Sequence, residues 1–173
     1  MIIDIHTHLF NRGWIPKGFF YGVARFITHE FAKQGIDESN ESVGDGIMEG
    51  SGDPEAEMLL AEMDEAGIDK SVIFPVDFGL ALGDPEVPIE TVNRKFAELA
   101  QKHPDRLCAF ASVDPLRKGA LDLWKRCVEE WGMKGLKLHP CSGFYPNQQE
   151  VYPLLQKACD WKLPVLIHSG SMM

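Results

Sequence analysis

The chain opens with Met1-Ile2-Ile3-Asp4-Ile5-His6-Thr7-His8, a short apolar run that ends in two histidines. Such a run predicts a short buried strand. Successive side chains of a strand point to opposite faces of the sheet, so His6 and His8 are expected on the same face. Two imidazoles placed in this way can bind one metal ion, because zinc takes histidine nitrogens at roughly 2.0–2.1 Å.

Four further short apolar segments, each followed by residues that favour turns, also predict buried strands. They span about residues 71–76, 107–112, 135–139 and 164–168. Helical patterns lie between them, and one helix is expected to begin at Asp53-Pro54, an N-cap residue followed by proline. Strands that alternate with helices in this rhythm are typical of βα units in a parallel sheet. The predicted fold class is therefore α/β.

One connection is much longer than the others. Roughly 60 residues separate the first strand from the second, and residues 9–53 are interpreted as an insertion. A helix is expected over about 22–33, and the Gly-, Ser- and acid-rich stretch 35–52 is expected to be mobile. In a βα barrel this insertion would lie over the catalytic face, where it would form a substrate lid or a pocket wall. A surface insertion or a subunit contact is an equally good interpretation.

Strand alternation also places polar side chains at the ends of the later strands. On the fourth strand Lys137 and His139 share one face, whereas Leu136 and Leu138 share the other. On the fifth strand His168 is expected to face inward. Active sites of parallel barrels collect at the carboxyl ends of the strands, so these strand ends predict a functional site.

Length and composition predict a single globular domain over residues 1–173, with 45% hydrophobic and 25% charged residues. A formal net charge of −9 argues against nucleic acid and anionic membranes as partners. No apolar stretch approaches the ~20 residues of a membrane span, and the four cysteines form no Cys-X-X-Cys pair. Because no basic leader precedes the first strand, a cytoplasmic location with free thiols is expected.

Several motifs in the same order resemble the amidohydrolase superfamily, in particular its branch of amidohydrolase-related, metal-dependent TIM barrels. The resemblance runs over nearly the whole chain apart from the insertion. The matching segments are 3–8, 63–70, 110–115, 134–140, 144–147 and 163–170. It implies a TIM (β/α)8-type barrel, of which this chain supplies about five βα units.

The resemblance also implies a set of site residues. His6 and His8 would be the metal ligands of the first strand, His168 the ligand of the fifth, and the cofactor a divalent metal, with Zn²⁺ expected. The family's acid–base histidine and metal-binding aspartate follow on later strands, so the catalytic residues stay unknown. Lys137 and His139 are interpreted as substrate-binding residues. The alternatives are carbamylation or an internal charge partner for Lys137, and a structural hydrogen bond for His139.

Sheet geometry limits how these ligands can meet. In a flat five-stranded sheet with a spacing of ~4.8 Å, the outer strands would lie roughly 19 Å apart. We therefore expect His168 to join His6 and His8 only in a closed barrel. The chain alone is expected to be inactive and to need a partner, either a second copy of itself or the C-terminal half of a barrel.

Three functions are compatible with this pattern. The first is a metal-dependent hydrolase that acts on a small carboxylic, amide, ester or lactone substrate through a metal-bound water. The second is a metal-dependent non-oxidative decarboxylase, a lyase acting on a small aromatic or unsaturated acid. The third is a truncated, non-catalytic family member. Both enzymes would bind a small-molecule substrate, and the same ligands serve both reactions.

Overall fold

The computed structural model of the chain describes residues 1–50 and 52–170. The strands form two parallel three-stranded sheets, and the strand order in each sheet follows the chain. The first sheet consists of β1 (Ile3–Thr7), β2 (Lys70–Ile73) and β3 (Leu107–Ala109). The second consists of β4 (Ala111–Ser112), β5 (Leu136–Leu138) and β6 (Val165–Ile167). This order confirms the predicted succession of βα units.

The strand predicted over 107–112 is divided at Phe110, which joins the two sheets. The Phe110 N–H still donates to the Ile73 carbonyl at 3.0 Å, whereas the next residue, Ala111, donates to the Gly135 carbonyl at 2.8 Å. A glycine is needed at 135, because a Cβ there would lie 2.5 Å from the Phe110 ring. The predicted strand is therefore correct in position but not continuous.

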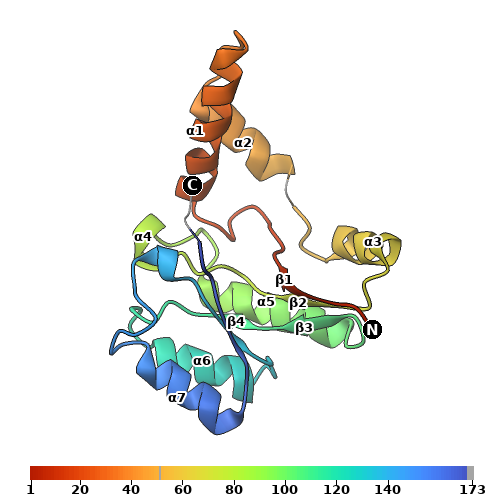
Figure 1. The fold of residues 1–173 in the computed structure, drawn as a ribbon, viewed down its shortest axis with the longest axis vertical. Helices are drawn as coiled ribbons and strands as arrows, with labels where there is room; N and C mark the ends of the chain where they lie inside the picture. The colour runs from red at the N-terminus through yellow and green to blue at the C-terminus, as the bar shows by residue number, and fades with distance from the viewer. Residues whose placement is uncertain (51, 171–173) are drawn as a thin grey trace.

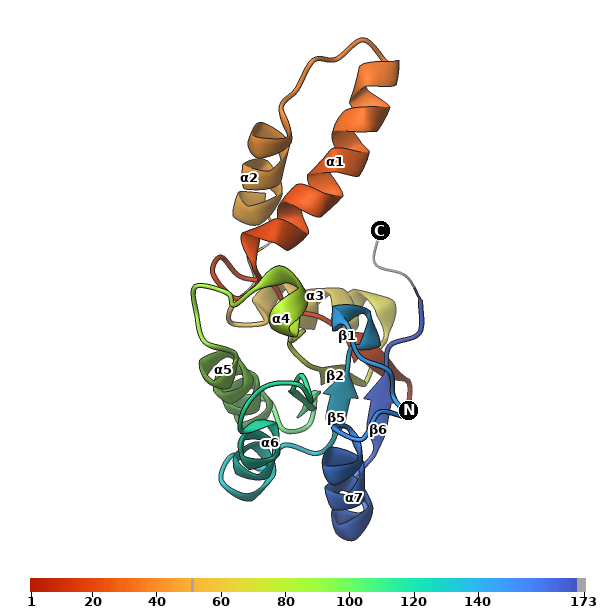
Figure 2. The ribbon, with the colours of Figure 1, turned by 90° about the vertical axis from the view of Figure 1, so that its left-hand side faces the viewer.

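Four helices pack around the outer side of the curved strands (Figure 1, Figure 2). They are α3 (Glu57–Ala66), α5 (Ile89–Lys102), α6 (Ala120–Glu129) and α7 (Tyr152–Trp161). Their apolar stripes meet one face of the sheets, where Phe96, Trp124 and Leu136 are fully buried in one cluster. A short helix α4 (Gly79–Leu82) follows β2, and a 3-10 turn, η1 (Pro140–Ser142), follows β5.

The insertion is largely helical and projects from the rest of the molecule (Figure 1, Figure 2). Helix α1 (Lys17–Lys33) begins earlier than the expected 22–33. Helix α2 (Asn40–Gly50) occupies most of the 35–52 stretch, where composition favours an irregular segment, and residue 51 lies outside the described residues. Within the described ranges, no helix is long and apolar enough to cross a membrane.

Asp53 caps helix α3, although the helix does not begin where the sequence predicts. The Asp53 carboxylate accepts hydrogen bonds from the N–H groups of Met58 at 3.3 Å and Leu59 at 2.9 Å. Ala56 has a φ of 60°, which a right-handed helix cannot accommodate, so the helix starts only at Glu57.

Candidate metal centre

His6 and His8 lie where β1 departs from regular pairing. The register between β1 and β2 shifts between Asp4 and Thr7, so β1 holds one more residue than β2 in this interval. The Asp4 carboxylate accepts hydrogen bonds from the His6 N–H at 2.9 Å and from the Thr7 hydroxyl at 2.8 Å. Such bulges redirect side chains and are frequent beside functional sites.

The two imidazoles have the spacing that one ion requires. Nε2 of His6 lies 3.2 Å from Nε2 of His8, and the ring centroids are 5.1 Å apart. Two nitrogens bound to a tetrahedral zinc would lie about 3.3–3.4 Å apart, with ring centroids about 5.2 Å apart. Nδ1 of His8 lies 3.3 Å from the Phe74 carbonyl oxygen, which can only accept, so Nδ1 carries the proton and Nε2 offers its lone pair. The pair fits a shared metal ion.

The curvature of the sheets brings His168, which follows β6, close to His6 at the opposite edge. Their ring centroids are 6.2 Å apart, which is about 1 Å more than two ligands of one tetrahedral ion need. The expectation that His168 stays out of reach without barrel closure is therefore wrong. The flat-sheet estimate of roughly 19 Å fails because strand twist and tilt already curve a partial barrel.

Lys137 is fully buried beneath His6, on the face that strand alternation predicts. Its Nζ lies 3.5 Å from His6 Nε2 and 4.6 Å from the centroid of the Phe74 ring. Leu136 and Leu138 point the other way, into the cluster formed with the helices. Removal from water disfavours the ammonium form and lowers the pKa of Lys137 from 10.5 to about 8.

Four histidines of the site are held in their neutral form. Desolvation, followed by the influence of a neighbouring histidine, lowers the pKa of both His8 and His139 to about 4. Desolvation and then the Lys137 charge also lower the pKa of His6 and of His168. Neutral imidazole is the form that ligates metals, so an ion binding at pH 7 need not displace protons from these rings.

The Lys137 pKa predicts a rise in stability with pH for the metal-free chain. Between pH 8 and 10.5 the folded protein releases this proton before the unfolded chain does, so the unfolded state binds more protons. The free energy of unfolding should therefore rise across this window by roughly 3 kcal/mol, since each pKa unit corresponds to about 1.4 kcal/mol. Urea unfolding at several pH values measures it. Lys137→Met removes the group and should flatten the curve, whereas equal pH slopes in the two proteins would contradict the assignment.

His139 is positioned by a chain of hydrogen bonds that starts at Asp77. The Ser142 hydroxyl donates to the Asp77 carbonyl oxygen at 3.1 Å, and its oxygen lies 3.0 Å from His139 Nδ1. Because the hydroxyl proton is already engaged, Ser142 accepts from Nδ1–H, and His139 Nε2 keeps its lone pair. The His139 ring lies beside that of His168, with centroids 4.7 Å apart.

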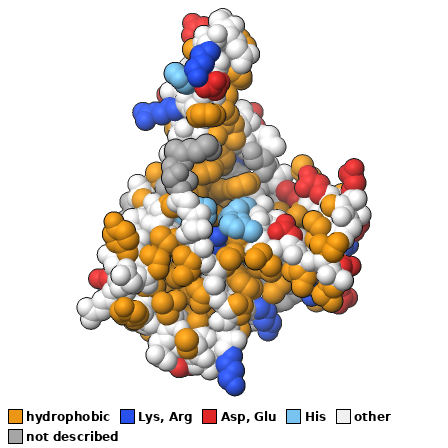
Figure 3. Space-filling view, viewed as in Figure 1, with side chains coloured by type: hydrophobic (Ala, Val, Ile, Leu, Met, Phe, Trp, Pro, Cys, Tyr) orange, Lys and Arg blue, Asp and Glu red, His pale blue; other side chains and the backbone are white. Residues whose placement is uncertain are grey.

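A cavity of about 290 Å³ opens beside three of these histidines. Histidine side chains gather near the centre of the face in Figure 3, below the projecting helices. Helix α1 forms one wall of the cavity, which supports the pocket-wall interpretation of the insertion. The lining includes three histidines and three phenylalanines: His8, His139, His168, Phe10, Phe19 and Phe78. The cavity is therefore largely apolar and aromatic, and its histidines are interleaved with phenylalanines.

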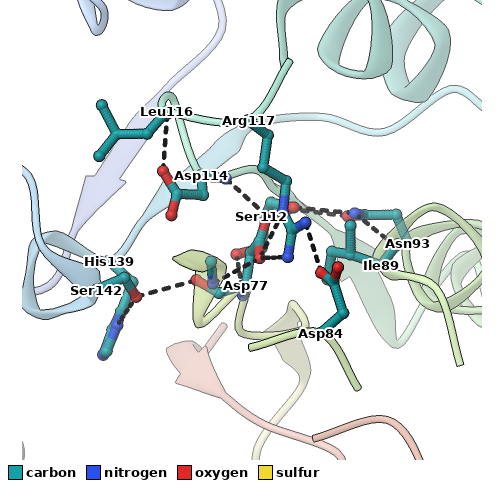
Figure 4. Close-up of polar contacts among 11 residues, drawn as sticks. Asp77, Asp84, Ile89, Asn93, Ser112, Asp114, Leu116, Arg117, His139 and Ser142 are labelled. Atoms are coloured by element: carbon teal, nitrogen blue, oxygen red, sulfur yellow. Dashed lines mark hydrogen bonds and ion pairs between the residues drawn. The ribbon is translucent and has the colours of Figure 1, made fainter. Parts of the chain in front are cut away.

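Asp77 and Arg117 form a buried ion pair that sequence reasoning missed (Figure 4). The Asp77 carboxylate is almost fully buried and accepts from Arg117 Nε at 2.8 Å and Nη2 at 2.9 Å, and also from the Asp114 N–H at 2.8 Å. Arg117 contacts the exposed Asp84 at 2.6 Å as well. These contacts join the loops after β2 and β4 next to His139. The two partners are 40 residues apart, and no local pattern relates them.

A family model described as amidohydrolase matches residues 3–173 of the chain. The match takes in the six strands of the described residues and the site histidines at positions 6, 8, 139 and 168.

Solved structures with the same fold include three enzymes. A 4-oxalomesaconate hydratase from Rhodopseudomonas palustris is 22% identical, with a TM-score of 0.57, over 97% of this chain and 52% of that one. A manganese-bound 5-carboxyvanillate decarboxylase from Novosphingobium aromaticivorans is 19% identical, with a TM-score of 0.63, over 97% and 50%. A 2,6-dihydroxybenzoate decarboxylase from Rhizobium is 17% identical, with a TM-score of 0.61, over 98% and 50%. The chain thus spans about half the length of these structures, and the likeness concerns the fold.

Proposed function

This chain belongs to the amidohydrolase family, and from that premise we propose that it carries the histidine part of a divalent-metal centre, with His6, His8 and His168 as ligands. The observation that carries the proposal is the 3.2 Å separation of the His6 and His8 Nε2 atoms. A bound divalent ion would supply Lewis acidity, polarising a substrate carbonyl or carboxylate and lowering the pKa of a water. Zn²⁺ is the expected ion, and the manganese of the similar 5-carboxyvanillate decarboxylase supports Mn²⁺ as the second choice.

The proposed reaction is hydrolysis of a small carboxylic, amide, ester or lactone substrate by the barrel to which these βα units belong. His139 holds its Nε2 lone pair toward the site, so it can accept a hydrogen bond from a substrate hydroxyl or amide. Lys137 supplies positive charge beneath His6, which favours an anionic group of the substrate nearby. The aromatic cavity wall excludes water from the rest of the substrate.

Decarboxylation of a small aromatic acid is the second candidate, and the cavity favours it. Phe10, Phe19 and Phe78 line the cavity, and the rings of Phe10 and Phe78 lie beside those of His8 and His139, with centroids 6.1 Å and 5.5 Å apart. A planar ring packed against these phenylalanines would lie next to the imidazoles, which could receive its carboxylate together with the charge of Lys137. Hydrolysis and decarboxylation need the same ligands, so the substrate that binds separates them better than the metal does.

The test places a small aromatic acid and a metal in the site together. A hydroxybenzoate is added to the chain loaded with Mn²⁺, whose paramagnetism broadens the NMR lines of nearby nuclei. We expect strong broadening with the wild-type chain and loss of it in Gly22→Trp, because Gly22 lines the cavity and has open space at its Cβ position. Gly46→Trp is the matched control, since Gly46 also lies on a helix with open space but away from the cavity.

Unbroadened lines in the wild-type chain, or equal broadening in both tryptophan variants, would contradict a substrate site beside the ion.

A separate experiment distinguishes the two reactions by offering a lactone and a hydroxybenzoate as alternative substrates. Ring opening of the lactone would indicate hydrolysis, and release of carbon dioxide from the acid would indicate decarboxylation.

A further inference from the structure

His168 has a second set of potential metal-binding neighbours besides His6 and His8. His139 follows β5, Cys141 lies in the η1 turn, and His168 follows β6. The ligand atoms of these three side chains all lie within 4.8 Å of one another. The His168 N–H donates to the Leu138 carbonyl at 2.9 Å, which holds the end of β6 against the end of β5. Pairing within the sheet therefore fixes the backbone of His168 relative to the end of β5.

Each histidine of this set can offer a nitrogen lone pair. The Ser142 contact keeps the proton of His139 on Nδ1, so that Nε2 remains free to ligate. The His168 ring lies 4.7 Å from the His139 ring and 6.2 Å from the His6 ring, measured between centroids. By this measure His168 lies closer to His139 than to its predicted co-ligand His6.

Cys141 is the residue that makes this set chemically different. Its half-buried thiol donates to the Gly170 carbonyl at 2.9 Å, just beyond His168. Ligands of a tetrahedral zinc with nitrogen and sulfur donors lie about 3.3–3.6 Å apart. The Cys141 sulfur already lies within 4.8 Å of a ligand nitrogen of each histidine, and the thiol proton would pass to solvent as the sulfur ligates.

We propose that His139, Cys141 and His168 form a second metal site, selective for ions that accept thiolate. Thiolate ligands favour Zn²⁺ over Mn²⁺ and Mg²⁺ more strongly than the imidazole pair of His6 and His8 does. Because both sets include His168, occupancy of one site withdraws a ligand from the other. The second site shares His168 with the proposed metal centre but can be distinguished from it, since neither His6 nor His8 belongs to the second site.

Cobalt substitution tests the site through a signal that only a sulfur ligand produces. Co²⁺ added to the metal-free chain should produce the near-ultraviolet charge-transfer absorption of thiolate bound to cobalt. The absorption should be lost in Cys141→Ser. It should persist in Cys159→Ser, the exposed-cysteine control, and in His6→Ala/His8→Ala. Circular dichroism verifies that each variant is folded.

A second measurement needs no variant. Zn²⁺ should slow alkylation of Cys141 by iodoacetamide at least about tenfold relative to alkylation of Cys159, measured by mass spectrometry of the peptides. The proposal is overturned if the wild-type chain shows no charge transfer, if the signal survives Cys141→Ser, or if it disappears in Cys159→Ser. Loss of the signal in His6→Ala/His8→Ala would show that the cobalt site needs these two histidines, and it would overturn the proposal of a separate second site. Manganese affinity, measured independently, tests the first site.

Discussion

Replacing both His6 and His8 by alanine is expected to lower the affinity of the chain for Mn²⁺ by more than about 100-fold. Even changes to residues that only support a metal ligand cost about 10- to 100-fold in affinity, and this variant removes two ligands outright. The two Nε2 atoms, 3.2 Å apart, have the spacing of two ligands of one tetrahedral ion. Isothermal titration calorimetry of chelator-treated protein measures the affinity. Mn²⁺ is the probe because it avoids the thiolate-containing cluster.

The matched control is His29→Ala/His103→Ala. These two histidines lie in α1 and at the end of α5, away from the site, and their removal changes the histidine count by the same amount. We expect the control to bind Mn²⁺ as the wild-type chain does. Equal affinities in the control and in His6→Ala/His8→Ala would exclude the histidine pair as the principal manganese site.

Replacing Asp77 by alanine is expected to lower the free energy of unfolding by about 3–5 kcal/mol, because it leaves the Arg117 charge without its buried partner. Asp77 is 3% exposed, and its carboxylate accepts from two Arg117 nitrogens and from the N–H groups of Gly79 and Asp114. Urea unfolding, followed by circular dichroism, measures the change.

Asp84→Ala is the control for the Asp77 variant. It removes the other carboxylate that contacts Arg117, at 2.6 Å, but this partner is 71% exposed at its side chain. Exposed ion pairs contribute roughly 0–1 kcal/mol, so the variant should change stability little. A loss in Asp84→Ala as large as that in Asp77→Ala would show that burial does not decide the strength of these contacts.

The site residues differ in how far local sequence predicts them. Lys137 and His139 lie on the predicted side of β5, because that strand is regular and its side chains alternate strictly. For His6 and His8, strand alternation alone does not give the side-chain positions, since the pairing of β1 with β2 is irregular between Asp4 and Thr7. The hydrogen bonds of Asp4 to the His6 N–H and the Thr7 hydroxyl belong to that irregularity, and no spacing of apolar residues reveals it.

The helices likewise differ in how far the local sequence predicts them. The apolar stripe of α5 is buried as its spacing predicts, with Val92, Phe96 and Leu99 in the core. Helix α3, in contrast, starts three residues after Pro54 because Ala56 takes a left-handed conformation. Composition likewise favours an irregular 35–52 stretch. Residues Asn40–Gly50 nevertheless form helix α2, which packs against α1. Tertiary contacts override weak local preferences in such segments.

Local patterns were enough for the order of strands and helices and for histidines at the strand ends, because both depend on periodicities of two and about 3.6 residues. The meeting of these histidines depends on the fold as a whole. The approach of His168 to His6, at 6.2 Å between ring centroids, follows from curvature accumulated over all the strands between β1 and β6. The Asp77–Arg117 pair and the place of Cys141 beside His168 likewise join loops that only the curved sheet brings together. Curvature is a sum of small twists between neighbouring strands, and no local stretch of residues encodes that sum.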